Sequence, residues 1–430
     1  MTKVEGLSGH FARHKLRIFR VSTTLIVNVA VLAANMASGI ITARGLDPVG
    51  RGELLAISMW PQIIASAFTF GMPAALVYEV HQKAVTPGAV YAGATLMITA
   101  TATAAAAAAA FVLPFLMGGK SAHLIHFAQA FLILTPIISV GLVSISLFQA
   151  LEDFRTYNGL RMLSPFSVIL FLLAVHMTVG LNPETAAYSY AASGIVLTIT
   201  GVSLAVSRLG GLAAAATRLR EAVRRLAIYG RSHAWADFMG AIEANLDKIL
   251  LAALLPAVDL GLYAVAYGSS RAMLAAASAI SAVDFPRAAG LARPDALRAM
   301  ARGAVLTALV ALPPLLIGIL FAGPLLHLVY GASFVAAETL LRLLLLEAYI
   351  LGIVFVLAHA FLAAGLPAIT SRVQAFSTVA SALAVLLGVS VGGATGAAIG
   401  LASVAAMKLA LLSIAFLGQR SRLRAAVTPA

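Results

Sequence analysis

The sequence contains no cysteine, and this absence excludes disulfide frameworks, thiolate metal sites and cysteine-based catalysis. Charge is scarce as well, because Asp, Glu, Lys and Arg together make up only 10% of the 430 residues. Soluble domains carry roughly 25% charged residues, so this chain cannot cover a water-facing surface. With 61% hydrophobic residues, the composition instead predicts a protein that lies within a lipid bilayer.

Familiar motifs of enzymes and metal proteins are missing too. The sequence has no nucleophile elbow, phosphate-binding loop or zinc motif. His176 and His359, which lie within apolar segments, lack partners at metal-ligand spacing. We therefore expect no cofactor, no metal and no catalytic residue. The first 20 residues form a polar, basic leader without the pattern of a cleaved signal peptide. The net charge of +13 is better explained by basic cytoplasmic loops than by binding to nucleic acid.

The apolar segments predict membrane-spanning helices. Only helices and closed barrels satisfy all their backbone polar groups inside a bilayer, and these segments are far longer than the roughly 10-residue strands of a barrel. We therefore expect an all-α, polytopic membrane protein with about 12 transmembrane helices of ordinary spanning length. Their expected ranges are 21–43, 54–80, 89–117, 124–150, 160–180, 185–207, 231–255, 260–284, 303–322, 338–364, 370–388 and 393–417.

The basic residues predict the orientation of these helices. Twenty-two lysines and arginines fall on the side that carries both termini, and four fall on the opposite side. Since cytoplasmic loops collect Lys and Arg, we expect both termini in the cytoplasm and an even number of helices. The four residues expected on the outer side are Arg44, Arg51, Lys120 and Arg342.

A long basic segment is expected to divide the membrane region into two six-helix lobes. The lobes comprise residues 21–207 and 231–417, and the segment at 208–230 forms a cytoplasmic linker between them. A leader at 1–20 and a cytoplasmic tail at 418–430 complete the chain. We expect arginines of the linker to contact anionic lipid headgroups.

An internal repeat supports this division. The segment ANMASGIITARGLDPVGRGELL from Ala34 is similar to ANLDKILLAALLPAVDLGLYAV from Ala244, about 210 residues later. Both halves start on the same side of the membrane, so the repeat is parallel, about an axis along the membrane normal. The charged, glycine-rich segment ARGLDPVGRGEL therefore marks an outer corner between two helices, and its weaker copy marks the same corner in the second half.

The corner segment resembles a known family. ITARGLDPVGRGELLAIS resembles the first corner of the polysaccharide flippases, the oligosaccharidyl-lipid branch of the multidrug/oligosaccharidyl-lipid/polysaccharide exporter superfamily. Members of that family tend to read A-R-x-L-G-P-x-G-x-G at this corner. The matching residues are Arg44, Pro48, Gly50 and Gly52. Asp47 departs from the pattern by replacing a glycine.

The second half also resembles this family. Its segment NLDKILLAALLPAVDLGLYAVAYGSS looks like the acidic-basic-apolar run of the flippases, followed by V-G-x-Y. The matching residues are Asp247, Lys248, Gly261 and Tyr263. Leu260 stands where the family has valine.

The resemblance implies a V-shaped pair of six-helix lobes around a central cavity. It also implies a function, which is to move sugars linked to undecaprenyl pyrophosphate across the bacterial cytoplasmic (inner) membrane for surface polysaccharide assembly. The implied partners are the lipid-linked sugar, membrane lipids, and the polysaccharide polymerase and glycosyltransferases of the same process.

Charged residues inside the expected helices are the sharpest functional signals. A central Asp, Lys or Arg costs roughly 2.5–3.5 kcal/mol to insert, so such residues face a bundle interior or a wet cavity. Those of the second half are Asp237, Glu243, Asp247, Lys248, Arg271, Glu347 and Lys408. A pyrophosphate needs cations, and Arg binds phosphate oxygens in a bidentate way. We therefore expect Arg271, Lys248 and Lys408 to bind the head group, although Lys408 has the alternative of only neutralising Glu347.

Spacing along the chain predicts two further relationships. Glu243 and Arg271 lie at similar distances from the tight turn at 256–259, so we expect them at the same depth, as an ion pair or in one network. The alternative is a purely structural pair. Glu243 and Asp247 lie one helical turn apart, which suits proton coupling because neighbouring carboxylates raise each other's pKa. The alternative here is that Lys248 and Arg271 keep both carboxylates ionised.

The first half offers polar rather than charged residues inside its helices. Asn28, Asn35 and Gln62 are candidates for a polar cavity lining. Arg44 belongs to the structural corner, where a long side chain can extend to the interface. Aromatic residues such as Trp235 and Tyr267 are candidates for stacking on sugars, with interface anchoring as the alternative.

Three other functional classes remain as alternatives. A cation-coupled drug antiporter of the same superfamily usually needs a carboxylate in the first-half cavity. In the first half of this chain, Glu79 and Glu152 lie only at the cytoplasmic ends of the expected helices. The lipid II flippase branch usually has fourteen spans. A membrane glycosyltransferase or polymerase needs a large outer loop or a constellation of carboxylates, and the outer loops of this chain are short.

Overall fold

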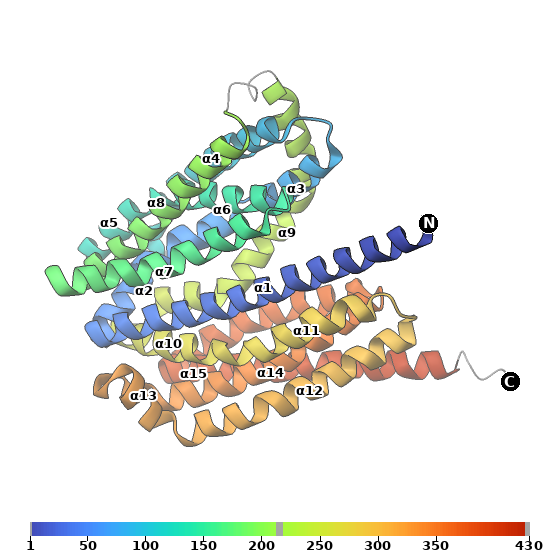
Figure 1. Cartoon of the computed structure of the whole chain (residues 1–430). Helices are drawn as coiled ribbons and strands as arrows, with labels where there is room; N and C mark the ends of the chain where they lie inside the picture. The colour runs from blue at the N-terminus through green and yellow to red at the C-terminus, as the bar shows by residue number, and fades with distance from the viewer. Residues whose placement is uncertain (1, 212–217, 426–430) are drawn as a thin grey trace. The chain divides into compact units, whose positions relative to one another are not determined.

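The computed structural model of the chain contains only helices in the part that it describes, residues 2–211 and 218–425 (Figure 1). The first half contains α1 (Thr2–Gly45), α2 (Pro48–Ala67), α3 (Met72–Gln82), α4 (Pro87–Leu116), α5 (Ala122–Phe131), α6 (Leu134–Ala150), α7 (Phe154–Thr178) and α8 (Pro183–Arg208). The second half contains α9 (Leu219–Leu254), α10 (Ala257–Ser270), the 3-10 turn η2 (Arg271–Met273), α11 (Leu274–Ala288), α12 (Arg293–Leu320), α13 (Ala322–Tyr330), the 3-10 turn η3 (Ala332–Ala337), α14 (Glu338–Ala363) and α15 (Pro367–Ala425).

Nine segments of the described chain are long and apolar enough to cross a membrane. They are Ile26–Gly45, Pro48–Gln82, Pro87–Leu116, Ala122–Ala150, Phe154–Thr178, Pro183–Arg208, Arg293–Leu320, Ala332–Ala363 and Pro367–Gln419. These segments confirm the expected all-α, multi-pass membrane fold. The number of twelve spans stays a prediction.

Two features separate the nine segments from the twelve expected helices. The expected spans 231–255 and 260–284 are not among the nine, because α9 carries several charged residues and η2 divides the other segment into the short helices α10 and α11. The expected helices 370–388 and 393–417 fall within α15, which consists of two helices that meet at a kink. The kink lies at Gly392 and Gly393, whose backbone angles are not helical.

Small residues bring the two parts of α15 together on either side of this kink. A Cβ atom added to Gly388 would lie 2.4 Å from the carbonyl oxygen of Gly396. A Cβ atom added to Gly400 would lie 2.6 Å from the carbonyl oxygen of Ala384. Close backbone approach through glycine is typical of helix pairs in membranes, where dispersion contacts rather than hydrophobic burial hold helices together.

α2 and α3 form one apolar segment with a break between them. Phe70 and Gly71 have φ angles of 49° and 68°, so the helix cannot continue through them. Asp237 of α9 closes the break, because its Oδ2 accepts hydrogen bonds from the Thr69 hydroxyl at 2.7 Å and from the Gly71 amide at 2.9 Å. The break lies within the candidate span Pro48–Gln82, where freed backbone groups need such a partner, so the carboxylate of Asp237 has a structural role.

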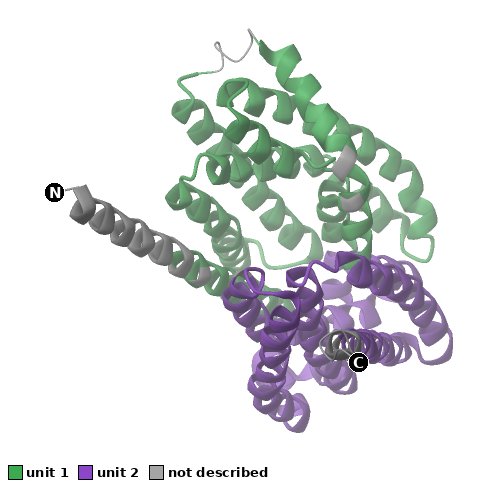
Figure 2. Ribbon diagram, turned by 90° about the vertical axis from the view of Figure 1, so that its right-hand side faces the viewer, with its two compact units in different colours: residues 1–45, 56–244 green, residues 46–55, 245–430 purple. Residues whose placement is uncertain are grey.

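The chain forms two compact units (Figure 2). The first unit comprises Met1–Gly45 and Ala56–Ala244, and the second comprises Leu46–Leu55 and Asn245–Ala430. Between them, the boundary within α9 lies after Ala244 and thus later in the chain than the expected linker at 208–230. The last part of the expected linker, from Leu219 on, forms the start of α9. The division into six plus six helices stays a prediction.

Each unit has its own apolar core. In the first unit α3, α4 and α6 pack around Leu76, Ile98 and Leu147, and Leu226 from the start of α9 joins them. In the second unit α14 is the central helix, because α11, α12 and α15 all pack against it. This arrangement places the buried face of α14 beside the residues of α10 and η2.

The glycine-rich corner begins α2. Asp47 precedes the helix, and its side-chain oxygen accepts a hydrogen bond from the Gly50 amide at 2.7 Å. This is the geometry of an N-cap, and Pro48 occupies the first helical position, where proline costs nothing. The aspartate that departs from the flippase pattern is therefore explained by its capping of the helix. Gly52 and Gly261, from the two copies of the corner, lie against each other within the second unit.

Candidate functional site

Three residues form one stripe along α10. Tyr263, Tyr267 and Arg271 follow one another at intervals of four positions, and side chains at that spacing lie above one another on a helix. α10 ends next to Arg271, where the chain passes through η2 into α11. Lys248 and Asp247 of α9 face this stripe, and α14 packs against its end.

Two cations lie near the ring of Tyr267. The Lys248 ammonium nitrogen is 4.9 Å from the centroid of its ring, and the central guanidinium carbon of Arg271 is 4.2 Å from it. Cations within about 6 Å of an aromatic face are attracted by its quadrupole, by ~2 kcal/mol where water is excluded. The ring thus holds two like charges close together. The structure brings Arg271 and Lys248 together at this ring, and their role as head-group cations stays a prediction.

Arg271 forms a buried ion pair with Glu347 of α14. The Nη2 atom of Arg271 donates to the Oε2 atom of Glu347 at 2.6 Å, and the two side chains are 21% and 6% exposed. The sequence analysis expected Glu243 and Arg271 to form an ion pair or to share a network, and this stays a prediction. The pairing of Arg271 with Glu347 was not expected, because it depends on the packing of α14, a helix distant in the sequence, against η2. Distances along two neighbouring helices contain no information about that contact.

One donor of Arg271 is buried without an acceptor. Its Nε atom forms no hydrogen bond with any residue that the structure describes. Buried polar groups are nearly always paired, so an unpaired donor requires an explanation. The guanidinium of Arg271, with one edge on a carboxylate, therefore has a further N–H group that can donate to an oxygen atom.

Asp247 accepts a hydrogen bond from the hydroxyl of Tyr263, which is fully buried. Lys248 donates to the side-chain oxygen of Asn245 at 3.0 Å. Two cations and two carboxylates, Lys248 and Arg271 with Asp247 and Glu347, therefore surround the tyrosine stripe. The cluster is balanced in formal charge, so an incoming anion competes with the carboxylates for the same donors.

The other expected charged residues lie elsewhere in this arrangement. Glu243 is half-buried on α9, one turn before Asp247. Lys408, after the kink in α15, donates to the side-chain oxygen of Gln374 before the kink. The structure pairs Glu347 with Arg271, and a role of Lys408 in neutralising Glu347 stays a prediction.

The polar candidates of the first half lie in the first unit. Asn28 of α1 accepts a hydrogen bond from Nη2 of Arg161 at 2.7 Å, and the Arg161 guanidinium lies 5.3 Å from the centroid of the Tyr157 ring. Asn35 is exposed on the same helix, and Gln62 is exposed on α2 beside Pro61. Arg161 had been counted only as a loop cation, and its contact with α1 was missed.

The sequence analysis underestimated the tyrosines. Tyr267 was considered only for stacking on sugars, and Tyr263 only as a match to the flippase pattern. The intervals from Tyr263 to Tyr267 and from Tyr267 to Arg271 were visible in the sequence and define one helix face. Within the described residues, no cluster of His, Asp or Glu is arranged to hold a metal ion.

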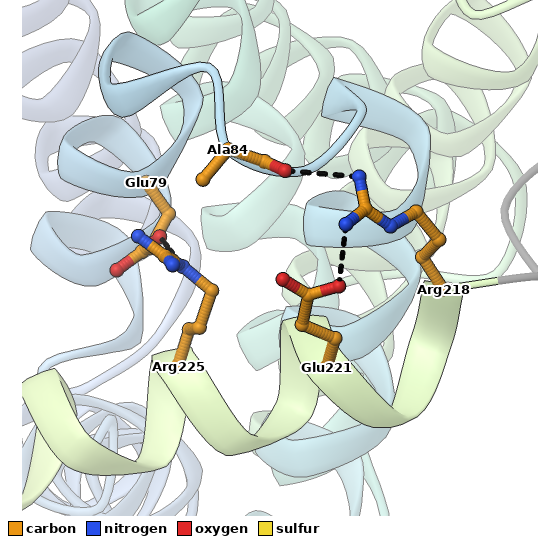
Figure 3. A network of polar contacts seen from close by, with 5 residues as sticks. All are labelled: Glu79, Ala84, Arg218, Glu221 and Arg225. Atoms are coloured by element: carbon orange, nitrogen blue, oxygen red, sulfur yellow. Dashed lines mark hydrogen bonds and ion pairs between the residues drawn. The ribbon is translucent and has the colours of Figure 1, made fainter.

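A second polar cluster joins α9 to the turn between α3 and α4 (Figure 3). The buried carboxylate of Glu79 accepts from Nε of Arg225 at 2.6 Å. Arg218 donates to the carbonyl oxygen of Ala84 at 3.0 Å and pairs with Glu221 at 2.8 Å. The hydrogen bond with Glu79 raises the pKa of the Arg225 guanidinium above its ordinary value. Since Arg225 lies outside the nine candidate spans, this cluster fixes the start of α9 at the edge of the membrane region.

Comparison of the sequence with protein families identifies one match over most of the chain. A family model described as "Polysaccharide biosynthesis protein" matches residues 20–291. No curated protein matches the sequence.

Comparison of the fold with solved structures identifies membrane transporters. The lipid II flippase MurJ, in an inward closed conformation, has a TM-score of 0.65 and 13% identity, and the match covers 91% of this chain and 86% of that chain. An inward-facing multidrug resistance MATE family transporter of the MOP superfamily has a TM-score of 0.67 and 16% identity, covering 93% and 98%. A MOP superfamily transporter from Pyrococcus furiosus has a TM-score of 0.55 and 14% identity, covering 96% of each chain. At these identities the likeness concerns the fold.

Proposed function

The chain belongs to the polysaccharide biosynthesis protein family, and from this membership we propose that it moves a lipid-linked oligosaccharide across the cytoplasmic membrane of a bacterium. The proposed substrate carries its sugars on a polyprenyl pyrophosphate such as undecaprenyl pyrophosphate. The proposed role is the delivery of these sugars for surface polysaccharide assembly.

The cation pair on Tyr267 is the observation that supports this substrate. Lys248 of α9 and Arg271 of η2 approach one aromatic ring, and the buried Nε donor of Arg271 has no acceptor among the described residues. A pyrophosphate supplies several anionic oxygens, and an arginine binds such oxygens through two parallel hydrogen bonds. If these segments cross the membrane as the sequence predicts, the two charges are costly to insert and are retained where they serve a substrate or an ion.

Release of the carboxylates follows from binding at this site. A pyrophosphate that takes the donors of Lys248 and Arg271 competes with Glu347 and with the charge of Asp247. The bound state therefore differs from the empty state in the pairing of α10 and η2 with α14. A ligand shifts a conformational equilibrium only through such differential interactions, and alternating access is the transition proposed here.

The first unit supplies groups suited to sugars. Asn28, Asn35 and Gln62 lie on α1 and α2 with exposed side chains, and amides both donate to and accept from hydroxyl groups. The three amides are uncharged, which favours a neutral ligand over a cationic drug.

The activity proposed is transport without chemical conversion. Membrane placement with both termini in the cytoplasm, and cooperation with a polymerase and glycosyltransferases, are parts of the same proposal.

Binding of inorganic pyrophosphate by the purified full-length protein tests the proposed site. We expect calorimetry to detect binding that weakens at least tenfold in Lys248→Gln and in Tyr267→Leu, and less in Tyr267→Phe, which keeps the aromatic face. The matched control is Tyr188→Leu, whose ring packs against Phe127 in the first unit. Unchanged binding in both Lys248→Gln and Tyr267→Leu would remove the head-group site from the proposal.

A further inference from the structure

The first turns of α9 have two different faces. Ala222 and Leu226 are buried in the core of the first unit, and Tyr229 stacks on Tyr78 with ring centroids 4.7 Å apart. Gly230 approaches the break between α2 and α3, because a Cβ atom there would lie 2.5 Å from the carbonyl oxygen of Phe70. This inner face fixes the rotation of the helix about its axis.

The polar cluster of Figure 3 fixes the same segment from its beginning. Arg225 pairs with the buried Glu79, and Arg218 bonds to the carbonyl oxygen of Ala84. Two of the arginines that the sequence places in the linker and the following turn are therefore used for internal contacts. These contacts fix the orientation of the helix and therefore determine which side chains form its outer face.

The outer face of these turns is basic. Arg220, Arg224 and Arg231 are exposed, and Ile228 lies among them with 62% of its side chain exposed. Positions 220, 224, 228 and 231 fall on one side of a helix. None of the three arginines forms an ion pair with another residue in the described parts of the chain.

We propose that this outer face, formed by Arg220, Arg224, Ile228 and Arg231, binds the headgroups of anionic phospholipids. A basic helix face that contains an exposed apolar side chain is suited to the boundary between headgroups and acyl chains. Each arginine near an anionic leaflet contributes to binding, and the attraction is screened by salt.

The position of the segment identifies the lipid surface as the occupant. The candidate span Pro48–Gln82 ends, and the candidate span Pro87–Leu116 begins, at the turn between α3 and α4. The start of α9 lies against this turn. Arg218 bonds to Ala84 within that turn. The ends of two adjacent spans lie at the level of the headgroups, so Arg220 and Arg224, next to that turn, lie where headgroups are present. Arg231 lies about two helical turns further along α9, and its long side chain can extend toward the same level. The proposal does not depend on the transported substrate.

Native mass spectrometry of the full-length protein tests this proposal. Phosphatidylglycerol and phosphatidylcholine with the same acyl chains are added in equal amounts to the protein in detergent. We expect preferential retention of phosphatidylglycerol, and an affinity that falls at least tenfold in the triple variant Arg220→Gln, Arg224→Gln, Arg231→Gln. Roughly fivefold per arginine is the expected scale near an anionic surface.

The matched control removes the same charge elsewhere. Arg155, Arg287 and Arg302 are exposed and lie on other helices, so their triple replacement by Gln is expected to leave phosphatidylglycerol affinity within twofold of wild type. If the triple variant does not fold, the single variant Arg224→Gln replaces it as the test. Its expected effect is about a fivefold loss of phosphatidylglycerol affinity.

Three results would overturn the proposal. The first is equal retention of the two lipids by the wild type. The second is equal loss of phosphatidylglycerol in the test and control variants. The third is tighter binding of soluble poly-glutamate than of phosphatidylglycerol at the same face, which would indicate an acidic protein partner.

Discussion

Gly52 of α2 and Gly261 of α10 lie where the two helices approach so closely that neither position has room for a Cβ atom. A Cβ atom added to Gly52 would lie 1.8 Å from the carbonyl oxygen of Ala257, and one added to Gly261 would lie 1.9 Å from that of Pro48. The contact is reciprocal, since each glycine meets the residue four positions before the other. The two copies of the corner motif therefore meet through their equivalent residues.

This contact predicts that alanine at Gly52 is strongly destabilising. Alanine normally favours a helix over glycine by about 1 kcal/mol. Here the added methyl group overlaps backbone atoms, which cannot rotate away, so the two helices must separate. We expect Gly52→Ala to lower the free energy of unfolding by about 3 kcal/mol, measured by thermal unfolding in detergent.

Gly39→Ala is the control for this prediction. A Cβ atom at Gly39 meets nothing within 4 Å, so its replacement is expected to be neutral or slightly stabilising. Equal effects of the two substitutions would show that the reciprocal contact does not stabilise the fold.

The ion pair between Arg271 and Glu347 predicts non-additive mutations. Removal of one partner leaves a buried charge, so we expect Arg271→Gln and Glu347→Gln each to cost about 3–5 kcal/mol of unfolding free energy. The double variant is expected to cost less than the sum of the two, because neither charge then remains unpaired.

The exposed pair of Arg342 and Glu338 is the matched comparison. Its contact is 2.5 Å long, but the two side chains are 44% and 33% exposed. We expect Arg342→Gln to cost less than about 1 kcal/mol. Additive losses at Arg271 and Glu347 in chemical unfolding would contradict a buried, coupled pair.

The fold class could be read from the sequence because it depends on local properties. Low charge and long apolar segments define membrane helices wherever they occur, and the positions of Gly52 and Gly261 followed from the repeated corner. The cation pair of Lys248 and Arg271 was also expected, because charges within apolar segments are rare and therefore informative.

The partners of the site residues could not be read in the same way. Glu347 pairs with Arg271 only because α14 packs against η2, and this contact joins segments far apart in the chain. Likewise the role of Asp237 depends on the break at Phe70 and Gly71. A backbone with positive φ at a phenylalanine leaves no signal in the hydrophobic pattern.

Asp237 is expected to hold the break between α2 and α3 in place. Its carboxylate accepts from the Thr69 hydroxyl and the Gly71 amide, so Asp237→Ala leaves two donors unpaired at a cost of about 1–3 kcal/mol. Asp237→Asn keeps an acceptor and is expected to cost less. Hydrogen exchange at residues 69–71 checks this, since faster exchange is expected in the alanine variant, and equal protection in both variants would contradict the role.

Glu243 and Asp247 are the proposed link between transport and protons. Asp247 lies near Lys248 and Arg271, the two cations at the Tyr267 ring. Glu243 lies one turn earlier on α9. We expect Glu243→Gln or Asp247→Asn to reduce the response of transport to an imposed pH gradient in proteoliposomes by about tenfold. Asp295→Asn, at an exposed pair with Arg298, is the control. A wild-type gradient response in both test variants would assign these carboxylates to structure alone.

The central claim is that Lys248 and Arg271 recognise a pyrophosphate, and a flipping assay with two matched lipids tests it most directly. Proteoliposomes are supplied with one saccharide on a polyprenyl pyrophosphate and the same saccharide on a polyprenyl monophosphate. The double variant Arg271→Gln, Glu347→Gln removes the guanidinium without leaving a buried carboxylate unpaired. We expect the wild type to move the pyrophosphate lipid at least tenfold faster than the monophosphate lipid, and the folded double variant to lose this preference. Equal rates for both lipids in the wild type, or an unchanged preference in the double variant, would contradict the account.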